Sequence, residues 1–600
     1  HTFTHPDLAR SSPLATRLEL DATNRVIEAV LGRRTVLFRP PYFGDAEPTT
    51  EDALGPVRAA TALGFVTAGL HVDALDWRAG VRPGEIVTAA LRARDGRAED
   101  AHVVLLHDGG GDRAATLAAV GPLVDSLRAR GDSLVLLSEL VGVSRDAAMP
   151  ALPPSSAAGR WTALAAFALA GAVDHGLTLL LGTAVVLGVA RLLAVAALAM
   201  IQRRRRPDTA PAAVVPPYAP AVTVLVPAYN EERVVAKTVA SLLAQRYAGP
   251  LDVLVVDDGS PDGTYAAAVA AFGAHPRVRV VRKPNGGKAS ALNHGLAMAR
   301  GEVVVALDAD TVFRPDTVAE LVAPMADPRV GAVAGNAKVG NRVNLVTRWQ
   351  AVEYVTSQNL DRRASALLDC ITVVPGAVGA WRVAAVRAAG GFSHDTLAED
   401  QDLTIAVRRL GWRVAYAERA VAYTEAPDTL GGLARQRFRW SFGTLQCMWK
   451  HRDALLQPRY GALGLVALPN VWLFQLLFTA VSPVADLLFV LSLAGTVVAR
   501  AQHGGAYAAE RLGAVLAGSL LFLLADWLAG VLAFRMEPGE DRRLAWLILL
   551  QRFAYRQVMY WVVVRSFAAA LRGRVVGWGT LERKATVAAP DAPAAAPLAA

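Results

Sequence analysis

Two carboxylates stand two residues apart at the end of a strand-like run in the middle of the chain. The run Val303–Leu307 is apolar, and Asp308 and Asp310 follow it directly. Carboxylates in this arrangement can share one hard divalent cation, Mg²⁺ or Mn²⁺, which would also take the oxygens of a diphosphate. Such a pair of aspartates is common by chance, so the prediction of a metal site depends on the motifs that precede the pair.

Polar residues also follow two earlier strand-like runs, Val222–Val226 and Val253–Val256. In an open α/β sheet, ligands bind beyond the carboxyl ends of the strands, so both loops should lie on one rim. An aspartate there can accept a hydrogen bond from a nucleobase or a ribose hydroxyl, although helix capping is the structural alternative. The candidate binding residues on this rim are Pro227, Tyr229, Glu231, Asp257 and Asp258.

A glycine pair precedes Lys288, at the start of the helical pattern Ala289–Ala299. Backbone N–H groups and a lysine at a helix start suit contact with phosphate. The same residues would also make an ordinary turn. Lys288 is therefore a candidate for binding the phosphates of a nucleotide.

Two later segments offer a base and a binding surface. The acidic run Glu399–Asp402 predicts a general base that takes a proton from an acceptor hydroxyl. Asp400 is the candidate, Glu399 and Asp402 compete with it, and a solvated acidic turn is the structural alternative. Farther on, Trp440 offers a flat face for a sugar ring, while Gln436 and Arg439 can hold acceptor or diphosphate oxygens. A basic collar at a membrane surface would look similar.

The N-terminal region carries a different set of chemical groups. His1 and His5 are four apart, so on a helical turn both imidazoles could bind one Zn²⁺. His107 follows another strand-like run and could act as a general acid beside a carboxylate. Two further runs, Arg39–Tyr42 and Asp73–Trp77, each follow a strand-like segment.

The composition indicates a membrane protein. The chain has 600 residues, 53% of them hydrophobic, and a formal net charge of +9. Its arginines cluster beside apolar segments, which favours a lipid bilayer over nucleic acid as the partner. Two cysteines, Cys370 and Cys447, cannot build a disulfide framework. The usage of Ala and Arg is typical of a bacterial chain.

Apolar and polar stretches divide the chain into parts. Strand-like runs at 36–38, 64–66, 103–106 and 134–137 alternate with helical patterns at 51–63 and 114–130, which predicts parallel βα units. Leu177–Ile201 is long enough to cross a bilayer and ends in four arginines, and 161–173 could be a second span. Farther on there are four more apolar segments, 462–480, 483–499, 512–534 and 544–564, of which the last could span the membrane or lie along its surface.

The predicted parts are an N-terminal domain (1–145), a linker (146–160), transmembrane segments (161–202), a second domain (221–455), C-terminal transmembrane or interfacial helices (456–567), and a basic segment with a disordered tail (568–600).

The middle motifs resemble a known series. Asp257–Asp258, Asp308–Asp310, Glu399–Asp400 and Gln436–Trp440 are similar to the D, DxD, ED and QxxRW motifs of processive family-two glycosyltransferases, such as chitin, hyaluronan, cellulose and poly-N-acetylglucosamine synthases. The closing run Gln551–Gln557, with 577–579, resembles the last of these in particular. The resemblance implies a GT-A-like, mostly parallel α/β domain and an inverting mechanism. By this resemblance Asp400 is the catalytic base, Asp308 and Asp310 bind the metal and UDP, and Trp440 holds the acceptor. Ala398 stands where the family usually has Thr.

The N-terminal motifs resemble those of polysaccharide deacetylases, which implies a (β/α) barrel truncated at its N-terminus. By this resemblance His1 and His5 are two of three metal ligands, and His107 is the acid. The resemblance also implies that a groove is shaped by Arg39, Tyr42, Asp76 and Trp77. The family's upstream T-F-D-D-G segment, with the catalytic base and the third ligand, is not in this chain. We therefore expect this chain to deacetylate poorly or not at all, and a longer parent to do so.

Together the resemblances imply a synthase that polymerises N-acetylglucosamine from UDP-N-acetylglucosamine and exports a polysaccharide on which the fused deacetylase acts. A hyaluronan- or cellulose-like product, a non-processive glycolipid transferase and a degenerate scaffold remain alternatives. By the positive-inside rule, the transferase domain is cytoplasmic and the N-terminal domain lies outside a bacterial plasma membrane crossed several times. Export or outer-surface accessory proteins are candidate partners.

Overall fold

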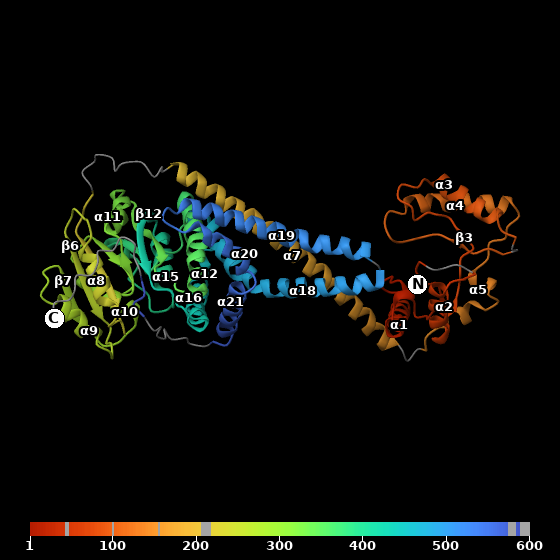
Figure 1. Ribbon diagram of the computed structural model, residues 1–600, viewed down its shortest axis with the longest axis horizontal. Coiled ribbons are helices and arrows are strands. Elements are labelled where there is room, and N and C mark those ends of the chain that lie inside the picture. Colours follow the sequence, from red (N-terminus) through yellow and green to blue (C-terminus); the bar gives the residue numbers. More distant parts are fainter. Residues whose placement is uncertain are drawn as a thin grey trace. The chain divides into compact units, whose positions relative to one another are not determined.

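The computed structural model describes residues 1–42, 47–98, 101–153, 157–205, 218–503, 505–573 and 584–587. The chain divides into two compact units, His1–Gly182 with Phe489–Ala517, and Thr183–Leu488 with Gly518–Ala600 (Figure 1). Residues 206–217, residues 577–579 and most of the predicted basic segment and tail (568–600) lie outside the described residues.

The first unit begins with short parallel strand pairs and the helices between them. β1 (Leu37–Phe38) pairs with β2 (Val66–Thr67), and β3 (Val72–Asp73) pairs with β4 (Val104–Leu105), both in parallel. The helices are α1 (Pro13–Leu31), α2 (Glu51–Ala62), α3 (Pro83–Asp95), α4 (Ala114–Ala129), α5 (Leu137–Leu140) and α6 (Arg145–Ala148). The parallel βα pattern is thus present, and among the described residues it consists of these two separate pairs.

The strand predicted at 134–137 is wrong. Residues 134–136 belong to no strand, and α5 starts at Leu137. The side chains of Leu134, Val135 and Leu136 are about half exposed, so the run lacks the buried face that would make it a core strand.

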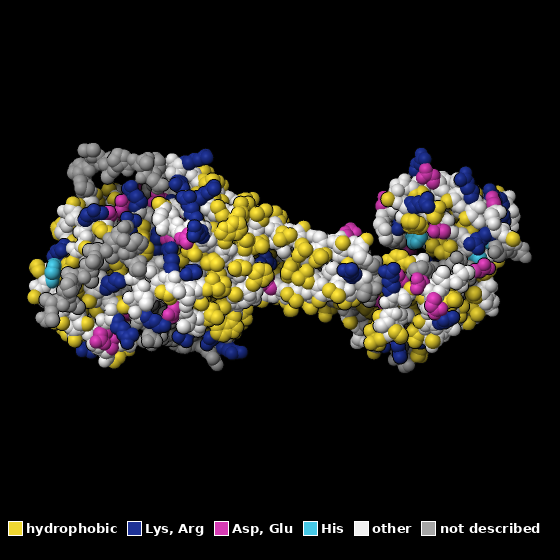
Figure 2. Space-filling view, in the orientation of Figure 1, with side chains coloured by type: hydrophobic (Ala, Val, Ile, Leu, Met, Phe, Trp, Pro, Cys, Tyr) yellow, Lys and Arg dark blue, Asp and Glu magenta, His cyan; other side chains and the backbone are white. Residues whose placement is uncertain are grey.

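In the part of the chain that the structure describes, three helical stretches are long and apolar enough to cross a membrane: Ala157–Arg205, Leu463–Arg500 and Leu516–Met536. The first is one 49-residue helix, α7, so the predicted segments 161–173 and 177–201 are continuous. The predicted segments 462–480 and 483–499 likewise merge, because α18 (Phe478–His503) continues through Pro483 and follows two π-helical turns at Leu463–Ala467 and Val471–Leu477. Apolar side chains crowd the surface of these helices (Figure 2).

The last predicted segment, 544–564, is not among these candidate spans. It comprises the end of a 3₁₀ turn (Arg542–Trp546) and two helices, α20 (Leu547–Gln551) and α21 (Tyr555–Leu571). α21 packs against α16 (Leu430–Lys450) of the second unit. The third candidate span is most of α19 (Gly505–Met536).

The second unit is built on an eight-stranded sheet of order β7-β6-β5-β8-β11-β10-β12-β9. β7 (Val278–Arg282), β6 (Leu251–Asp257), β5 (Val222–Ala228) and β8 (Val303–Ala306) are parallel neighbours. The other strands are β9 (Val312–Phe313), β10 (Val330–Val339), β11 (Gly379–Arg382) and β12 (Arg413–Thr424). β10 and β12 are parallel, whereas β11 runs antiparallel to β8 and β10, and β9 to β12. The mixed, mostly parallel sheet that the motifs imply is therefore present.

Helices cover both faces of the sheet, and its strands are buried on both sides (Figure 1). Such strands read as continuous apolar runs because neither face meets water. The helices are α8 (Val235–Leu243), α9 (Thr264–Phe272), α10 (Lys288–Met298), α11 (Thr317–Val322), α12 (Leu345–Glu353), α13 (Leu360–Leu367), α14 (Val383–Ala388) and α15 (Glu399–Arg409). A π-helical turn, Tyr354–Asn359, joins α12 to α13.

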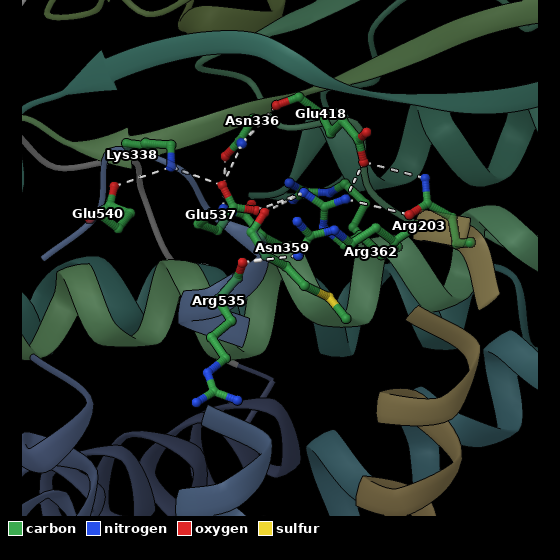
Figure 3. Close-up of polar contacts among 12 residues, drawn as sticks. Arg203, Asn336, Lys338, Asn359, Arg362, Glu418, Arg535, Glu537 and Glu540 are labelled. Carbon is green, nitrogen blue, oxygen red and sulfur yellow. Dashed lines mark hydrogen bonds and ion pairs between the residues drawn. The ribbon is translucent and has the colours of Figure 1, made fainter. Parts of the chain in front are cut away.

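A buried charge network ties the end of α19 to this sheet (Figure 3). Glu537, one residue past α19, accepts hydrogen bonds from Lys338 at 2.8 Å and Asn336 at 2.9 Å, both on β10. Arg363 of α13 reaches the other carboxylate oxygen at 3.1 Å and also pairs with Glu418 of β12. The end of a candidate membrane helix is thus fixed to β10 of the sheet.

Candidate active site

The carboxyl ends of β5, β6 and β8 lie side by side, because these strands are parallel neighbours in register. Asp257 ends β6, Asp308 comes two residues after β8, and Tyr229 follows β5 with its side chain 37% exposed. The structure therefore brings the three loops to one rim. Pro227 is still within β5, and Glu231, whose N–H donates to Thr264 Oγ1 at 2.8 Å, lies in the loop after that strand.

Asp258 organises the glycine loop that follows β7. Its carboxylate accepts hydrogen bonds from the N–H of Gly287 at 2.7 Å and from Lys283 Nζ at 2.5 Å. Asp257 is fully buried, 3.1 Å from Arg282 Nε. Gly259 has a φ of +71° and packs so closely on the loop that a Cβ would stand 2.8 Å from the N of Asn285. Asp258 thereby fixes the loop that leads into α10, whose first residue is Lys288.

Lys288 joins the carboxylates of two motifs that are far apart in the sequence. Its Nζ lies 2.6 Å from Asp308 Oδ1 and 3.0 Å from Glu399 Oε1. Burial opposes the charged ammonium, but the surrounding carboxylates outweigh burial and raise the pKa of Lys288 above its ordinary value. A cation held in this way can neutralise phosphate oxygens that enter the rim.

Asp400 lies in the first turn of α15, next to this cluster. Its Oδ2 accepts a hydrogen bond from the N–H of Gly376 at 2.9 Å, and its Oδ1 accepts one from Gln401 N at 2.8 Å. Burial raises the pKa of the Asp400 carboxyl above its usual range, while Lys288 and these N–H groups act in the opposite direction. The raised pKa makes Asp400 a stronger proton acceptor.

Gly376 leaves the space in which these groups meet. A Cβ at this position would stand 2.7 Å from Lys288 Nζ, 3.5 Å from Asp400 Oδ2 and 3.9 Å from Asp308 Oδ1. A side chain at this one position would therefore meet the lysine, the candidate base and the first aspartate of the metal motif. The sequence placed these residues in separate motifs, and the fold brings them together.

The chemistry of Asp308 and Asp310 fits a divalent cation. Both donors are hard carboxylate oxygens at the exit of one strand, which suits Mg²⁺ or Mn²⁺. The Asp310 side chain is buried, and Thr424 Oγ1 donates to its Oδ1 at 3.3 Å. Among the described residues, no cluster of three or more His, Cys, Asp or Glu side chains could hold a metal ion.

The predicted acceptor residues lie on α16, which is attached to α15. Thr444 donates to Gln401 Oε1 at 2.8 Å, and Leu397 N donates to Gln446 Oε1 at 2.9 Å. Ala398 packs on Gly443, where an added Cβ would stand 2.8 Å from the Ala398 Cβ. The loop before Asp400 is thus held against the helix that carries Gln436, Arg439 and Trp440.

Asp402, a competing candidate for the base, forms ion pairs outside the Lys288 cluster. Its carboxylate lies 2.8 Å from His451 Nε2 and 2.9 Å from Lys450 Nζ. These contacts hold the pKa of Asp402 below its usual value although burial raises it. Asp402 therefore anchors α15 to the end of α16 and does not join the Lys288 cluster.

Sequence reasoning missed Glu353, Tyr354 and Arg437. Tyr354 is buried with its ring 6.4 Å from that of Trp440, and burial raises its pKa to about 12. Arg437 is buried beside Gln436. Its position inside the QxxRW run was the one available signal.

In the first unit, the predicted residues form two groups. The rings of His1 and His5 are 4.7 Å apart, His5 contacts Tyr42, and Arg39 Nη2 lies 3.4 Å from His1 Nε2.

The second group is centred on His107, whose Nδ1 lies 2.7 Å from Asp76 Oδ1. Burial raises the pKa of Asp76, but hydrogen bonds from His107 and Thr116 outweigh it and lower the value. Trp77 is half exposed and donates to Asp73 at 3.2 Å.

Two parts of the chain are similar to known protein families. Residues 219–443 match the model of the family described as glycosyltransferase like family 2, and residues 1–57 match that of polysaccharide deacetylase. Residues 219–443 are thus similar to family-two glycosyltransferases, and residues 1–57 are similar to polysaccharide deacetylases.

The chain is similar to the poly-beta-1,6-N-acetyl-D-glucosamine synthases of Staphylococcus aureus (strain COL) and Staphylococcus epidermidis. Each is 30% identical to it over 223 residues, which are 37% of this chain and 54% of the relative. The chain therefore spans about half the length of these curated relatives.

Among solved structures, a mannosyltransferase from Pyrobaculum calidifontis in complex with GDP-Man and Mn²⁺ is 22% identical. The match covers 66% of this chain and 99% of that one, with a TM-score of 0.41. Staphylococcus aureus TarS is 20% identical over 36% of this chain and 38% of that one, with a TM-score of 0.27.

Proposed function

We propose that the chain is a membrane-bound, inverting and processive β-glycosyltransferase that polymerises N-acetylglucosamine from UDP-N-acetylglucosamine. The observation that carries this proposal is the meeting of Lys288, Asp308 and Asp400 around Gly376. These groups combine an anchor for a diphosphate with a base for an acceptor hydroxyl, and both are needed for direct displacement at an anomeric carbon.

The chemistry follows from the positions of these groups. The oxygen of the acceptor hydroxyl forms a bond to the anomeric carbon, and Asp400 accepts the proton of that hydroxyl. At the same time the bond from the anomeric carbon to UDP breaks. The ammonium of Lys288 stabilises the negative charge that develops on the leaving diphosphate. A divalent cation, Mg²⁺ or Mn²⁺, held by Asp308 and Asp310 would supply further neutralisation of the same charge.

The donor sugar is proposed from the neighbouring domain and the relatives. A deacetylase-type segment fused to a transferase is useful when the product carries N-acetyl groups, and the named relatives make an N-acetylglucosamine polymer. The three apolar helices support a location in the plasma membrane. Arg203–Arg205 at the end of α7 favour the cytoplasm for the transferase domain, where nucleotide sugars are found, and the extracytoplasmic side for the N-terminal domain.

Product analysis tests the proposal. Membranes containing the chain are incubated with labelled UDP-N-acetylglucosamine or UDP-glucose, and the products are separated by size. We expect N-acetylglucosamine in long, deacetylase-sensitive chains. Incorporation of glucose alone would refute the donor assignment, and single sugars on lipid would refute processivity.

A further inference from the structure

Arg437 is one of the largest fully buried side chains in the protein, with 1% of its surface exposed. It lies on α16, three residues before Trp440 and therefore on the same face of the helix. A buried guanidinium without partners would be very costly, so its contacts indicate what it is placed to do.

The first partner is Glu353, the last residue of α12. Arg437 Nη2 lies 2.5 Å from Glu353 Oε2, and Arg437 Nε is 3.2 Å and 3.3 Å from the two carboxylate oxygens. Contact through two nitrogens fixes the plane of the guanidinium as well as its position. The π-helical turn that begins at Tyr354 follows Glu353 directly, and such turns are frequent at functional sites.

The second partner is Tyr555, the first residue of α21. Its hydroxyl donates to Glu353 Oε2 at 2.5 Å and lies 3.4 Å from Arg437 Nη2. Its ring is buried in an apolar cluster with Trp349 and Leu433. Three helices from distant parts of the sequence thus meet at one carboxylate.

The guanidinium held in this way supports the acceptor motif. The Arg437 Cζ lies 4.0 Å from the centre of the Trp440 ring, a cation–π contact, and Arg437 Nη1 donates to Gln436 Oε1. Trp440 itself is 38% exposed, so part of the indole remains open to a ligand. Arg437 therefore touches both Gln436 and Trp440 from the buried side.

We propose that Arg437, oriented by Glu353 and Tyr555, is a positioning residue that holds Trp440 and Gln436 in the orientation needed to bind the terminal sugar ring of the acceptor. This inference rests on the proposed function. It also assigns a role to Tyr555, which belongs to the run Gln551–Gln557 near the end of the chain. α21 is then a part of the acceptor site and not only a peripheral helix.

The test compares three conservative variants in membranes. Tyr555→Phe removes only a hydroxyl, Arg437→Lys keeps the charge but loses the planar contact, and Glu353→Gln removes the negative charge. We expect the rate of polymerisation to fall about tenfold or more and the chains to shorten, as misplacement of a binding group predicts. The KM for UDP-N-acetylglucosamine should stay within about twofold of the wild-type value. The exposed Arg435, changed to Lys, is the matched control on the same helix and should leave all three unchanged.

A second comparison separates positioning from a purely structural role. In a Trp440→Ala background, Tyr555→Phe should cause less than about a twofold further loss, because its effect acts through Trp440. Equal losses in both backgrounds, or wild-type chain length in Tyr555→Phe, would overturn the inference. A wild-type chain that incorporates no sugar would instead overturn the proposed function, and the positioning role with it. Since Glu353→Gln could impair folding, the conclusion is drawn from Tyr555→Phe with an unchanged unfolding midpoint.

Discussion

Replacing Glu537 by Gln should destabilise the second unit strongly. The Glu537 carboxylate forms ion pairs with Lys338 Nζ at 2.8 Å and Arg363 Nη2 at 3.1 Å (Figure 3). Both cationic side chains are about 95% buried. After the change Lys338 keeps Glu540 at 3.2 Å and Arg363 keeps Glu418. Removing one carboxylate of this buried network should therefore cost an amount at the lower end of about 3–5 kcal/mol. At about 2 °C per kcal/mol for a large domain, the apparent unfolding midpoint should fall by roughly 6 °C.

The assay is thermal unfolding of the detergent-solubilised chain. Glu302→Gln is the matched control, because Glu302 pairs with Arg382 at 2.9 Å but is 56% exposed. Such a surface pair contributes about 0–1 kcal/mol, so the control midpoint should move by no more than about 2 °C. The double variant Lys338→Met with Glu537→Gln should lose less than the sum of the two single variants. Equal effects for Glu537→Gln and Glu302→Gln would refute the reasoning.

The same carboxylate predicts a dependence on pH. Burial raises the pKa of Glu537, but Lys338 and Arg363 outweigh it and lower the value in the folded state. A lowered folded-state pKa means that the folded chain resists protonation of this group. Its contribution to stability is therefore complete above the ordinary pKa of glutamate and is lost as the pH falls through the lowered value. Comparing midpoints of wild type and Glu537→Gln at neutral and acidic pH should show the difference shrinking towards acid.

Three further predictions concern catalysis. Asp400→Asn should lower UDP-dependent sugar transfer by about 10²–10⁴-fold with unchanged expression, because general base catalysis is lost; continued synthesis would contradict the role of Asp400. Lys288→Met should lose more activity than Lys288→Arg, which keeps the charge beside the diphosphate; similar losses in both would show that charge is not the reason. Treatment with EDTA should abolish transfer, and added Mg²⁺ or Mn²⁺ should restore it; full activity in EDTA would exclude a metal at Asp308 and Asp310.

Local sequence patterns predicted where helices and strands lie better than they predicted where one helix continues into the next segment. Continuous apolar runs predicted β5, β6 and β8 correctly, because buried parallel strands cannot alternate with polar residues. The same signal failed at 134–137, where the apolar run lies exposed in a loop before α5. It also divided α7 and the stretch 463–500 at polar residues or Pro483, although a long helix can continue through both.

The sequence by itself determined the acidic motifs, because the type and spacing of Asp308, Asp310 and Asp400 are local properties. It also determined the apolar helices, since length and composition suffice for them. Only the tertiary structure decided which carboxylates share Lys288, that Asp402 instead pairs with His451, and that Gly376 leaves the space between the groups. The meeting of Glu353, Arg437 and Tyr555 likewise joins residues up to 202 positions apart. No local pattern encodes such contacts, because they form only when helices from distant segments pack together.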